Sequence, residues 1–236
     1  MSARTRRALR TRRALRALSA VLIIAGVLML IDAGLTLAWQ EPVSGVYAWI
    51  LQGRLGGELR DLERASPRGV ERRALRALEG DRRRMAFLAR ALKRSAGRGA
   101  AVGRIRIPRL HASYVVVNGS DAGSLRKGPG IYDETPFPGA PGTVAIAGHR
   151  TTYAAPFGDI DDLRPGDAAT LEMPYGRFTY EVQHTRIVSP SELSVIRRVS
   201  FDRLVLSACH PLYSAARRIV VSLRLVQAQP RGAARR

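Results

Sequence analysis

The C-terminal half of the sequence predicts an all-β domain, either a closed antiparallel barrel or a sandwich. Two observations lead to this expectation: short apolar runs recur at close spacing between residues 101 and 226, and little helical periodicity separates them. The N-terminal part differs, because it holds one long apolar stretch and then an arginine-rich segment with helical periodicity. We therefore expect a β-domain preceded by a transmembrane helix and a helical stalk.

The first forty residues have the composition of a membrane anchor. Residues 1–16 contain seven arginines and no acidic residue, and residues 17–39 are almost wholly apolar. These twenty-three residues, of which Asp32 is the one charged residue, would span about 34 Å as a helix, enough to cross a bilayer and contact its lipid. The basic tail predicts a single-pass protein with a cytoplasmic N-terminus and an extracellular remainder. A cleaved signal peptide is the alternative, but its apolar region is usually shorter.

Residues 40–100 are expected to form an extracellular helical stalk and linker. Ser66 and Pro67 are typical of a helix start. The apolar positions that follow share one helical face and are Leu75, Leu78, Met85, Leu88 and Leu92, while arginines crowd the other faces. Two interpretations remain open: the helix lies on an anionic membrane or cell-wall polymer, or it packs its apolar stripe on the folded domain or on another copy. The glycine-rich segment 95–103 is a plausible linker.

The strands are expected within residues 101–226. Alternating or continuous apolar runs, bounded by turn residues, predict strands at 104–108, 114–117, 143–147, 169–173, 177–183, 204–208 and 219–226. Residues 124–130 are expected to form a turn or a short helix, and residues 227–236 a basic C-terminal tail.

The net charge of +20 suggests a polyanionic partner, but its distribution argues against nucleic acid. Residues 1–16 carry +7 and residues 52–100 carry +8, whereas the longer segment 101–226 carries only +4. No nucleic-acid-binding motif accompanies the charge. We therefore expect no nucleic acid partner.

Cys209 is the only cysteine of the chain. It lies at the end of an apolar run, directly before a polar turn that contains Pro211. A lone thiol cannot form an internal disulfide, so it is either a small buried hydrophobe or a reactive group. His149 is the best-placed partner, because it too sits where an apolar strand ends in a loop. His210 adjoins the cysteine, and neighbouring strand residues point to opposite faces.

Arg218 opens the strand that follows the cysteine loop and could aim a planar fork of donors at the same place. A thiol needs a base or an imidazolium neighbour to act as a nucleophile at neutral pH. A tetrahedral oxyanion needs hydrogen-bond donors aimed at it, and arginine supplies two in one plane. Arg217 would face the other way, and His111 and His184 are expected on the surface.

Three features together resemble the sortases, and among them class E most of all. They are the segment 143–153 (Thr-Val-Ala-Ile-Ala-Gly-His-Arg-Thr-Thr-Tyr), the Cys-His-Pro at 209–211, and an arginine nine positions beyond the cysteine. The resemblance covers residues 101–226 and implies a closed eight-stranded β-barrel and a cysteine transpeptidase. By the family's pattern, His149 matches the catalytic histidine, Cys209 the nucleophile and Arg218 the arginine that stabilises substrate and oxyanion.

The resemblance also implies the substrates. The enzyme would cut a C-terminal sorting signal of a secreted protein, of the type Leu-Ala-x-Thr-Gly or Leu-Pro-x-Thr-Gly, between threonine and glycine. Cys209 would hold the threonine as a thioester until an amine of the peptidoglycan cross-bridge, or a pilin lysine, releases it. Tyr132, Ser207 and Ala208 are expected at the substrate groove, although Ala208 stands where the family has threonine. The segment 188–199 corresponds to the loop that cradles the first residues of the signal.

No cofactor or metal is expected. The acidic cluster Asp159, Asp161 and Asp162 is explained as well by a capped turn as by calcium. A zinc site made from Cys209, His210 and His149 lacks an evident fourth ligand.

Two other functions remain open. An L,D-transpeptidase would place its histidine and cysteine in one short motif, whereas 60 positions separate them here. A non-enzymatic, membrane-anchored β-barrel binding domain would hold the cysteine as a structural residue.

Overall fold

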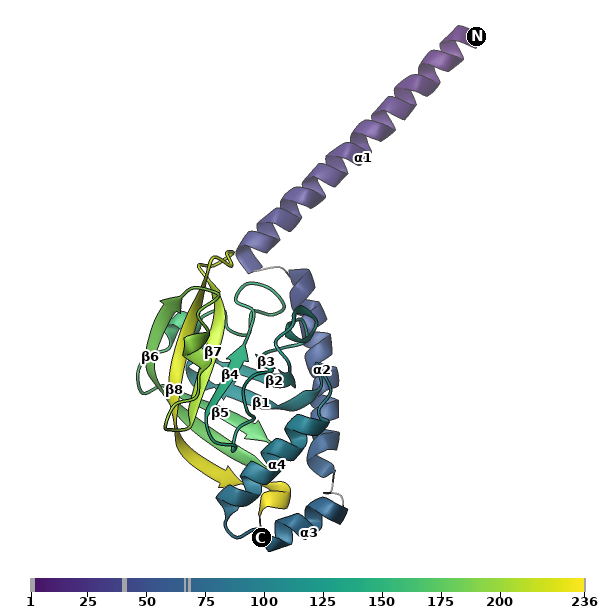
Figure 1. Cartoon of the computed structure of the whole chain (residues 1–236). Coiled ribbons are helices and arrows are strands. Elements are labelled where there is room, and N and C mark those ends of the chain that lie inside the picture. The colour runs from purple at the N-terminus through teal and green to yellow at the C-terminus, as the bar shows by residue number, and fades with distance from the viewer. Residues whose placement is uncertain (1–2, 40–41, 66, 68, 236) are drawn as a thin grey trace. The chain divides into compact units, whose positions relative to one another are not determined.

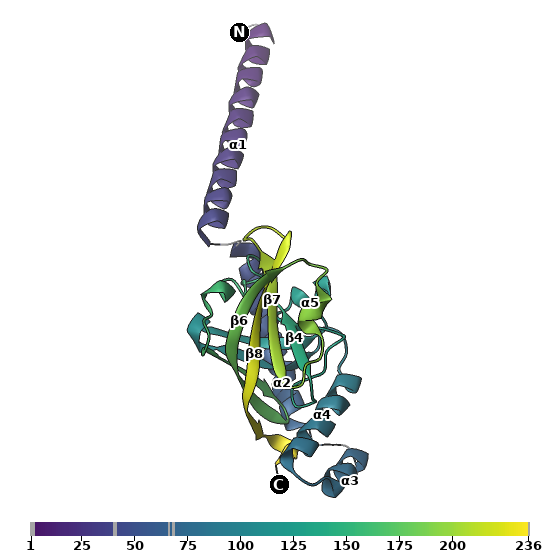
Figure 2. The same cartoon turned by 60° about the vertical axis from the view of Figure 1, so that its left-hand side comes forward.

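The computed structural model describes residues 3–39, 42–65, 67 and 69–235 (Figures 1 and 2). The chain divides into two compact units, Met1–Pro42 and Val43–Arg236.

The first unit consists of helix α1 (Ala3–Trp39). Its segment Leu15–Gly34 has a mean hydropathy of 2.3, is long enough to cross a membrane, and has none of its surface buried in protein. Its length and composition indicate a membrane anchor near the N-terminus. The boundaries 17–39 that the sequence predicts for the span stay a prediction.

The second unit is built on a closed barrel of eight strands, which confirms the predicted fold class. The strands are β1 (Ala101–Ile107), β2 (Ala112–Asn118), β3 (Gly130–Ile131), β4 (Thr143–Ala147), β5 (Ala168–Met173), β6 (Gly176–Val188), β7 (Arg203–His210) and β8 (Arg217–Pro230). Their order around the barrel is β1-β2-β3-β4-β7-β8-β6-β5. The expectation of a purely antiparallel sheet was wrong, because β2 pairs with β3, and β4 with β7, in parallel.

Strand β7 is a continuous apolar run because both of its faces are covered. Leu204, Leu206 and Ala208 point into the barrel core, whereas Val205 packs outside the barrel with Ala145 of β4. Each fully buried leucine of this kind stabilises the fold by about 1.5–3 kcal/mol. The rigid strand holds the end of β7, where Cys209 lies, in a defined position.

Helix α2 (Pro42–Arg64) packs against the barrel beside β2 (Figure 1). Leu55 and Leu59 of α2 join Val115 and Val117 of β2 in one buried cluster. The Gln52 side chain accepts from the backbone N–H of Val115 at 2.7 Å and donates to its carbonyl at 3.1 Å. This helix therefore belongs to the same compact unit as the barrel, rather than to a separate stalk.

The C-terminal part of the apolar stripe predicted from Leu75 to Leu92 packs on the barrel, which is the second of the two interpretations. The stripe is divided between α3 (Gly69–Ala77) and α4 (Asp81–Ser95). Met85 of α4 lies within the barrel core cluster, and Leu88 and Leu92 pack against it. The single helix is interrupted because Gly80 adopts a left-handed φ of 79°. Ser66, the expected helix start, lies outside the described residues.

The C-terminal segment also belongs to the fold, where a basic tail was expected. Strand β8 continues to Pro230, and a short helical turn, η4 (Gly232–Ala234), packs on α4. Arg84 of α4 is buried and donates from Nε to the carbonyl of Ala234 at 2.9 Å.

Candidate active site

Cys209, His149 and Arg218 come to the same end of the barrel because their strands are neighbours. Strand β4 runs parallel to β7 with Ala147 opposite Ser207. His149 follows β4 by two positions, which is the level that Cys209 occupies in β7. Strand β8 runs antiparallel to β7 and brings Arg218 directly opposite Cys209. The register therefore brings together three residues that are 60 and 9 positions apart in the chain.

The loop after β4 holds His149 by backbone and side-chain contacts. The N–H of Gly148 donates to the carbonyl of Ser207 at 3.0 Å, and the N–H of Phe157 donates to the carbonyl of His149 at 3.0 Å. Nδ1 of His149 lies 3.1 Å from Oγ1 of Thr152. Gly148 allows a close approach to Phe157, since a Cβ there would lie 2.5 Å from Cδ2 of that ring.

Cys209 is half-buried, so its thiol is not sealed in the barrel interior. Alternation along β7 puts Cys209 on the same side as Ser207 and puts Ala208 on the other. Ala208 is 3% exposed and packs in the barrel core. The structure thus separates Ala208 from the other two expected site residues of β7, because successive strand residues point to opposite faces.

Arg218 is half-buried at the start of β8. Its Nη1 donates to the carbonyls of Ala215 and Arg217, each at 3.0 Å. The loop between β7 and β8 therefore orients the guanidinium, which leaves other N–H donors of the planar fork for a substrate oxygen.

A buried arginine links the loop after β4 to the end of β7. The Arg150 side chain is 3% exposed, and its Nη2 lies 2.6 Å from Oδ2 of Asp161 in η2 (Ile160–Asp162). Its Nε donates to the carbonyl of Gly158 at 3.1 Å, and its Nη1 lies 2.9 Å from Nδ1 of His210. His210 is therefore turned toward Arg150, as the alternation along the strand predicts.

Tyr132 lies on the outer side of β7, next to Ser207. Its hydroxyl donates to Oγ of Ser207 at 3.5 Å. Its ring packs on an apolar cluster of β4, β6, β7 and β8 that also holds Val195 and Ile196 of η3 (Leu193–Ile196). This turn lies in the segment 188–199, which was expected at the substrate groove. Tyr132, Ser207 and η3 thus form one surface beside the cysteine strand.

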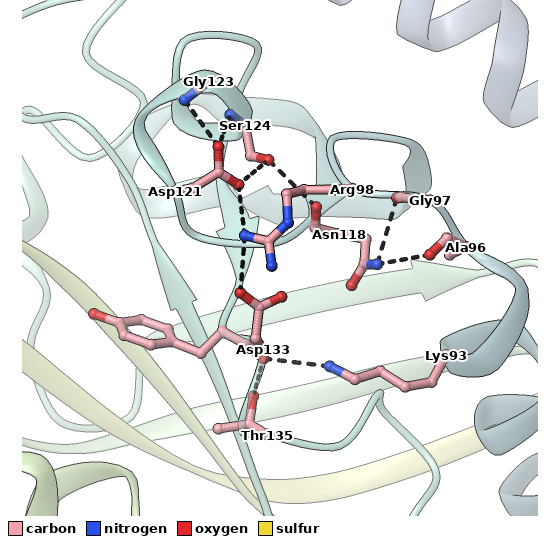
Figure 3. Close-up of polar contacts among 11 residues, drawn as sticks. Lys93, Ala96, Gly97, Arg98, Asn118, Asp121, Gly123, Ser124, Asp133 and Thr135 are labelled. Atoms are coloured by element: carbon pink, nitrogen blue, oxygen red, sulfur yellow. Dashed lines mark hydrogen bonds and ion pairs between the residues drawn. The ribbon is translucent and has the colours of Figure 1, made fainter.

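A polar network ties the backbone around Tyr132 to the end of α4 (Figure 3). Nζ of Lys93 donates to the carbonyl of Tyr132 at 3.4 Å, and burial lowers the pKa of this lysine. Arg98 bridges Asp121 and Asp133, with both distances 3.3 Å. The α4 end therefore supports the segment that carries Tyr132.

Comparison with known proteins decides the family. A model of the sortase domain matches residues 105–226, just over half of the chain. The chain belongs to the sortase family.

Two curated sortases are similar to the chain. Sortase D of Bacillus subtilis is 36% identical over 114 residues, which are 48% of this chain and 56% of that protein. Sortase SrtE1 of Streptomyces coelicolor is 30% identical over 151 residues, which are 57% of this chain and 42% of that protein. The chain thus spans about half the length of the curated relatives it matches.

Among solved structures, sortase E1 from Streptomyces coelicolor with a tripeptide in the active site is 27% identical, with a TM-score of 0.53. The match covers 56% of this chain and 91% of that chain.

The acidic turn of this sortase domain differs from the expected cap. Asp159 stands at the N-cap of η2, but its side chain makes no capping hydrogen bond. Asp161 instead pairs with Arg150. Among the residues that the structure describes, no three His, Cys, Asp or Glu side chains come together as metal ligands. His111 and His184 are exposed, as expected.

Sequence reasoning missed two residues of this sortase site. Arg150 has no periodic signal, and only its position directly after His149 could have singled it out. Tyr153 packs its ring on that of His149, with the centroids 4.9 Å apart and the planes inclined by 42°. Its signal is the Thr-Thr-Tyr sequence that closely follows the histidine.

Proposed function

We propose that this chain is a membrane-anchored cysteine transpeptidase in which Cys209 is the nucleophile. His149 transfers protons, and Arg218 binds the substrate carbonyl and its oxyanion. The proposal rests on the register of β4, β7 and β8. Cys209 of β7 lies opposite Arg218 of β8, and His149, two positions beyond the end of β4, comes to the same level of the barrel as Cys209. Membership of the sortase family supports the same chemistry.

The first half-reaction forms a thioester. His149 takes the proton of the Cys209 thiol, and the sulfur attacks the threonine carbonyl carbon of a Thr–Gly bond. The π electrons of the carbonyl move to its oxygen, which the Arg218 fork stabilises. When the intermediate collapses, the C–N bond breaks and His149 gives a proton to the leaving glycine amine.

The second half-reaction transfers the acyl group. An acceptor amine attacks the thioester carbonyl and loses a proton to His149. The C–S bond then breaks, the sulfur leaves as a thiolate or thiol, and a new amide remains. The free enzyme is restored without any cofactor.

The substrate we propose is a sorting signal of the Leu-Ala-x-Thr-Gly or Leu-Pro-x-Thr-Gly type, with class E preference for the former. The apolar surface at Val195 and Ile196 suits the aliphatic first residue of such a signal. Tyr132 and Ser207 offer hydroxyl groups to the peptide backbone beside it. Similarity to a sortase E1 solved with a tripeptide in its active site supports this assignment.

The proposed partners are secreted proteins with a C-terminal sorting signal and an amine of the peptidoglycan cross-bridge or a pilin lysine. We propose that the N-terminus is cytoplasmic and the barrel extracellular, since basic residues flank the apolar helix on its N-terminal side. Cys209 is the only cysteine, so a membrane-impermeant maleimide should label it in intact cells. Labelling only after lysis would show that the barrel lies in the cytoplasm, the opposite of the proposed topology.

A peptide assay tests the activity. The full chain in detergent should cleave a fluorogenic Leu-Ala-x-Thr-Gly peptide, and with triglycine it should yield the ligated product by mass spectrometry. Cys209→Ala should abolish both signals. If Cys209→Ala turned over the peptide as fast as the wild type, the thiol would have no part in the mechanism. No turnover, together with a thiol that native iodoacetamide leaves unmodified, would favour the non-enzymatic binding domain.

A further inference from the structure

The loop that follows His149 has an unusual backbone. Tyr153, Ala154 and Ala155 adopt positive φ values of 51°, 62° and 40° in succession. A side chain in this left-handed region meets steric conflict with its own backbone, so such conformations persist only where surrounding contacts impose them. Three consecutive cases in one loop require strong external support.

That support comes from two elements distant in the sequence. The backbone N–H of Tyr153 donates to Oγ of Ser44 in α2 at 3.1 Å. The Tyr114 hydroxyl of β2 donates to the carbonyl of Ala154 at 3.1 Å, and burial raises the pKa of this hydroxyl, so it remains a donor. The loop is therefore fastened from α2 and from β2.

An aromatic contact reinforces the attachment to α2. The Tyr47 ring meets the Tyr153 ring edge to face, with centroids 6.4 Å apart and an interplanar angle of 63°. The Tyr153 ring in turn packs on the imidazole of His149. Three rings thus connect the first turns of α2 to the imidazole. In the chain, α2 follows the apolar helix α1 after residues 40–41.

We propose that Tyr153 is a positioning residue for His149 and that Ser44 and Tyr47 at the start of α2 hold it in place. The segment that follows the apolar helix α1 in the chain thereby sets the orientation of the imidazole. This inference rests on the proposed function, in which His149 transfers protons. Thr152 contacts an edge of the ring at Nδ1, whereas Tyr153 covers part of its face.

The contact predicts an effect on turnover rather than on peptide affinity. The proposed peptide-binding residues Tyr132 and Ser207 belong to the cluster around η3, whereas α2 contacts the loop after β4. A misoriented imidazole slows proton transfer in the transition state, and a bound peptide loses no contact. The kcat should therefore fall while KM changes little.

The test is a double-mutant cycle on the full chain in detergent, with the fluorogenic peptide as substrate. Tyr47→Ala and Tyr153→Ala should each lower kcat by roughly tenfold and alter KM by less than about twofold. The double variant should be no slower than Tyr153→Ala, because both changes break the same connection. Tyr47→Phe should keep wild-type kcat, since the ring contact remains. Ser44→Ala is a milder variant that removes the hydrogen-bond acceptor of the Tyr153 N–H, and kcat should fall by roughly threefold.

Trp49→Ala is the matched control, because this aromatic residue of α2 is 76% exposed. It should leave kcat unchanged, and the thermal midpoints of all variants should stay close to the wild type. Wild-type kcat in Tyr153→Ala, or losses that multiply in the double variant, would overturn the inference. If Cys209→Ala kept full turnover, the proposed function itself would fail instead.

Discussion

Nη1 of Arg150 lies 2.9 Å from Nδ1 of His210, and these residues directly follow His149 and Cys209. Because arginine can only donate, Nδ1 of His210 is the acceptor in this contact. The contact joins the loop after β4 to the end of β7 on the side turned away from the thiol. The two proposed catalytic residues are thus linked by their own neighbours.

Removing this guanidinium should destabilise the barrel. In Arg150→Met, the partly buried Gly158 carbonyl and Nδ1 of His210 lose their donor, and Asp161 loses its ion pair, which together cost about 1–3 kcal/mol. Urea unfolding followed by far-UV circular dichroism measures the loss. Arg164→Met, at an exposed position, is the control and should unfold like the wild type. Equal stability of both variants would show that the buried network contributes nothing.

Arg218→Lys should be a poor enzyme that folds normally. The lysine keeps the charge but not the planar fork, which the carbonyls of Ala215 and Arg217 orient in the wild type. Losing an oxyanion donor lowers kcat by about 10²–10³-fold, so the peptide assay should register a fall of this order. Arg217→Lys, on the exposed neighbouring position, should retain activity. A kcat within a factor of about two of the wild type in Arg218→Lys would contradict the role of the fork.

Gly148→Ala should reduce both stability and activity. The new Cβ would lie 2.5 Å from Cδ2 of Phe157, a ring that is fully buried, so either the ring or the His149 loop must move. Overpacking of this kind costs about 1–3 kcal/mol. Phe157→Leu combined with Gly148→Ala should recover part of the loss, because leucine lacks the Cε2 atom and can turn its methyl groups away from the new Cβ. Gly97→Ala meets no atom within 4 Å and serves as the control.

Asp121→Asn should make the protein less sensitive to acid. Hydrogen bonds from the Ser124 hydroxyl and backbone hold the pKa of Asp121 at about 2, below its ordinary value of 3.8. A depressed pKa stabilises the fold above pH 3.8, and this contribution is lost as the pH falls toward 2. Asparagine can still cap α5 (Ala122–Leu125) but does not titrate. Between pH 5 and pH 2.5, the thermal midpoint of Asp121→Asn should therefore fall less than that of the wild type. Asp162→Asn is the control, and its thermal midpoint should fall as far as that of the wild type.

Several strands could be predicted because their signal is local. The apolar runs at 143–147 and 169–173 coincide with β4 and β5 within one residue. Strands β6 and β8 extend well beyond their apolar runs, because their polar ends pair with each other from Gly176 with Pro230 onward. Strand β3 has only two residues, and it exists because β2 and β4 supply its hydrogen bonds. The spacing of apolar residues in the sequence does not indicate such pairing between strands.

The class of the fold and an apolar helix ahead of it could be predicted from the sequence, because both follow from local patterns of apolar residues. The assignment of Cys209, His149 and Arg218 to the active site stays a prediction, which rests on the family resemblance. Tertiary structure alone decided the parallel pairing of β4 with β7, the Arg150–His210 contact and the attachment of Tyr153 to α2. The reason is physical. Each of these depends on two segments 60 or more positions apart meeting at one place, and no short window of sequence contains both partners.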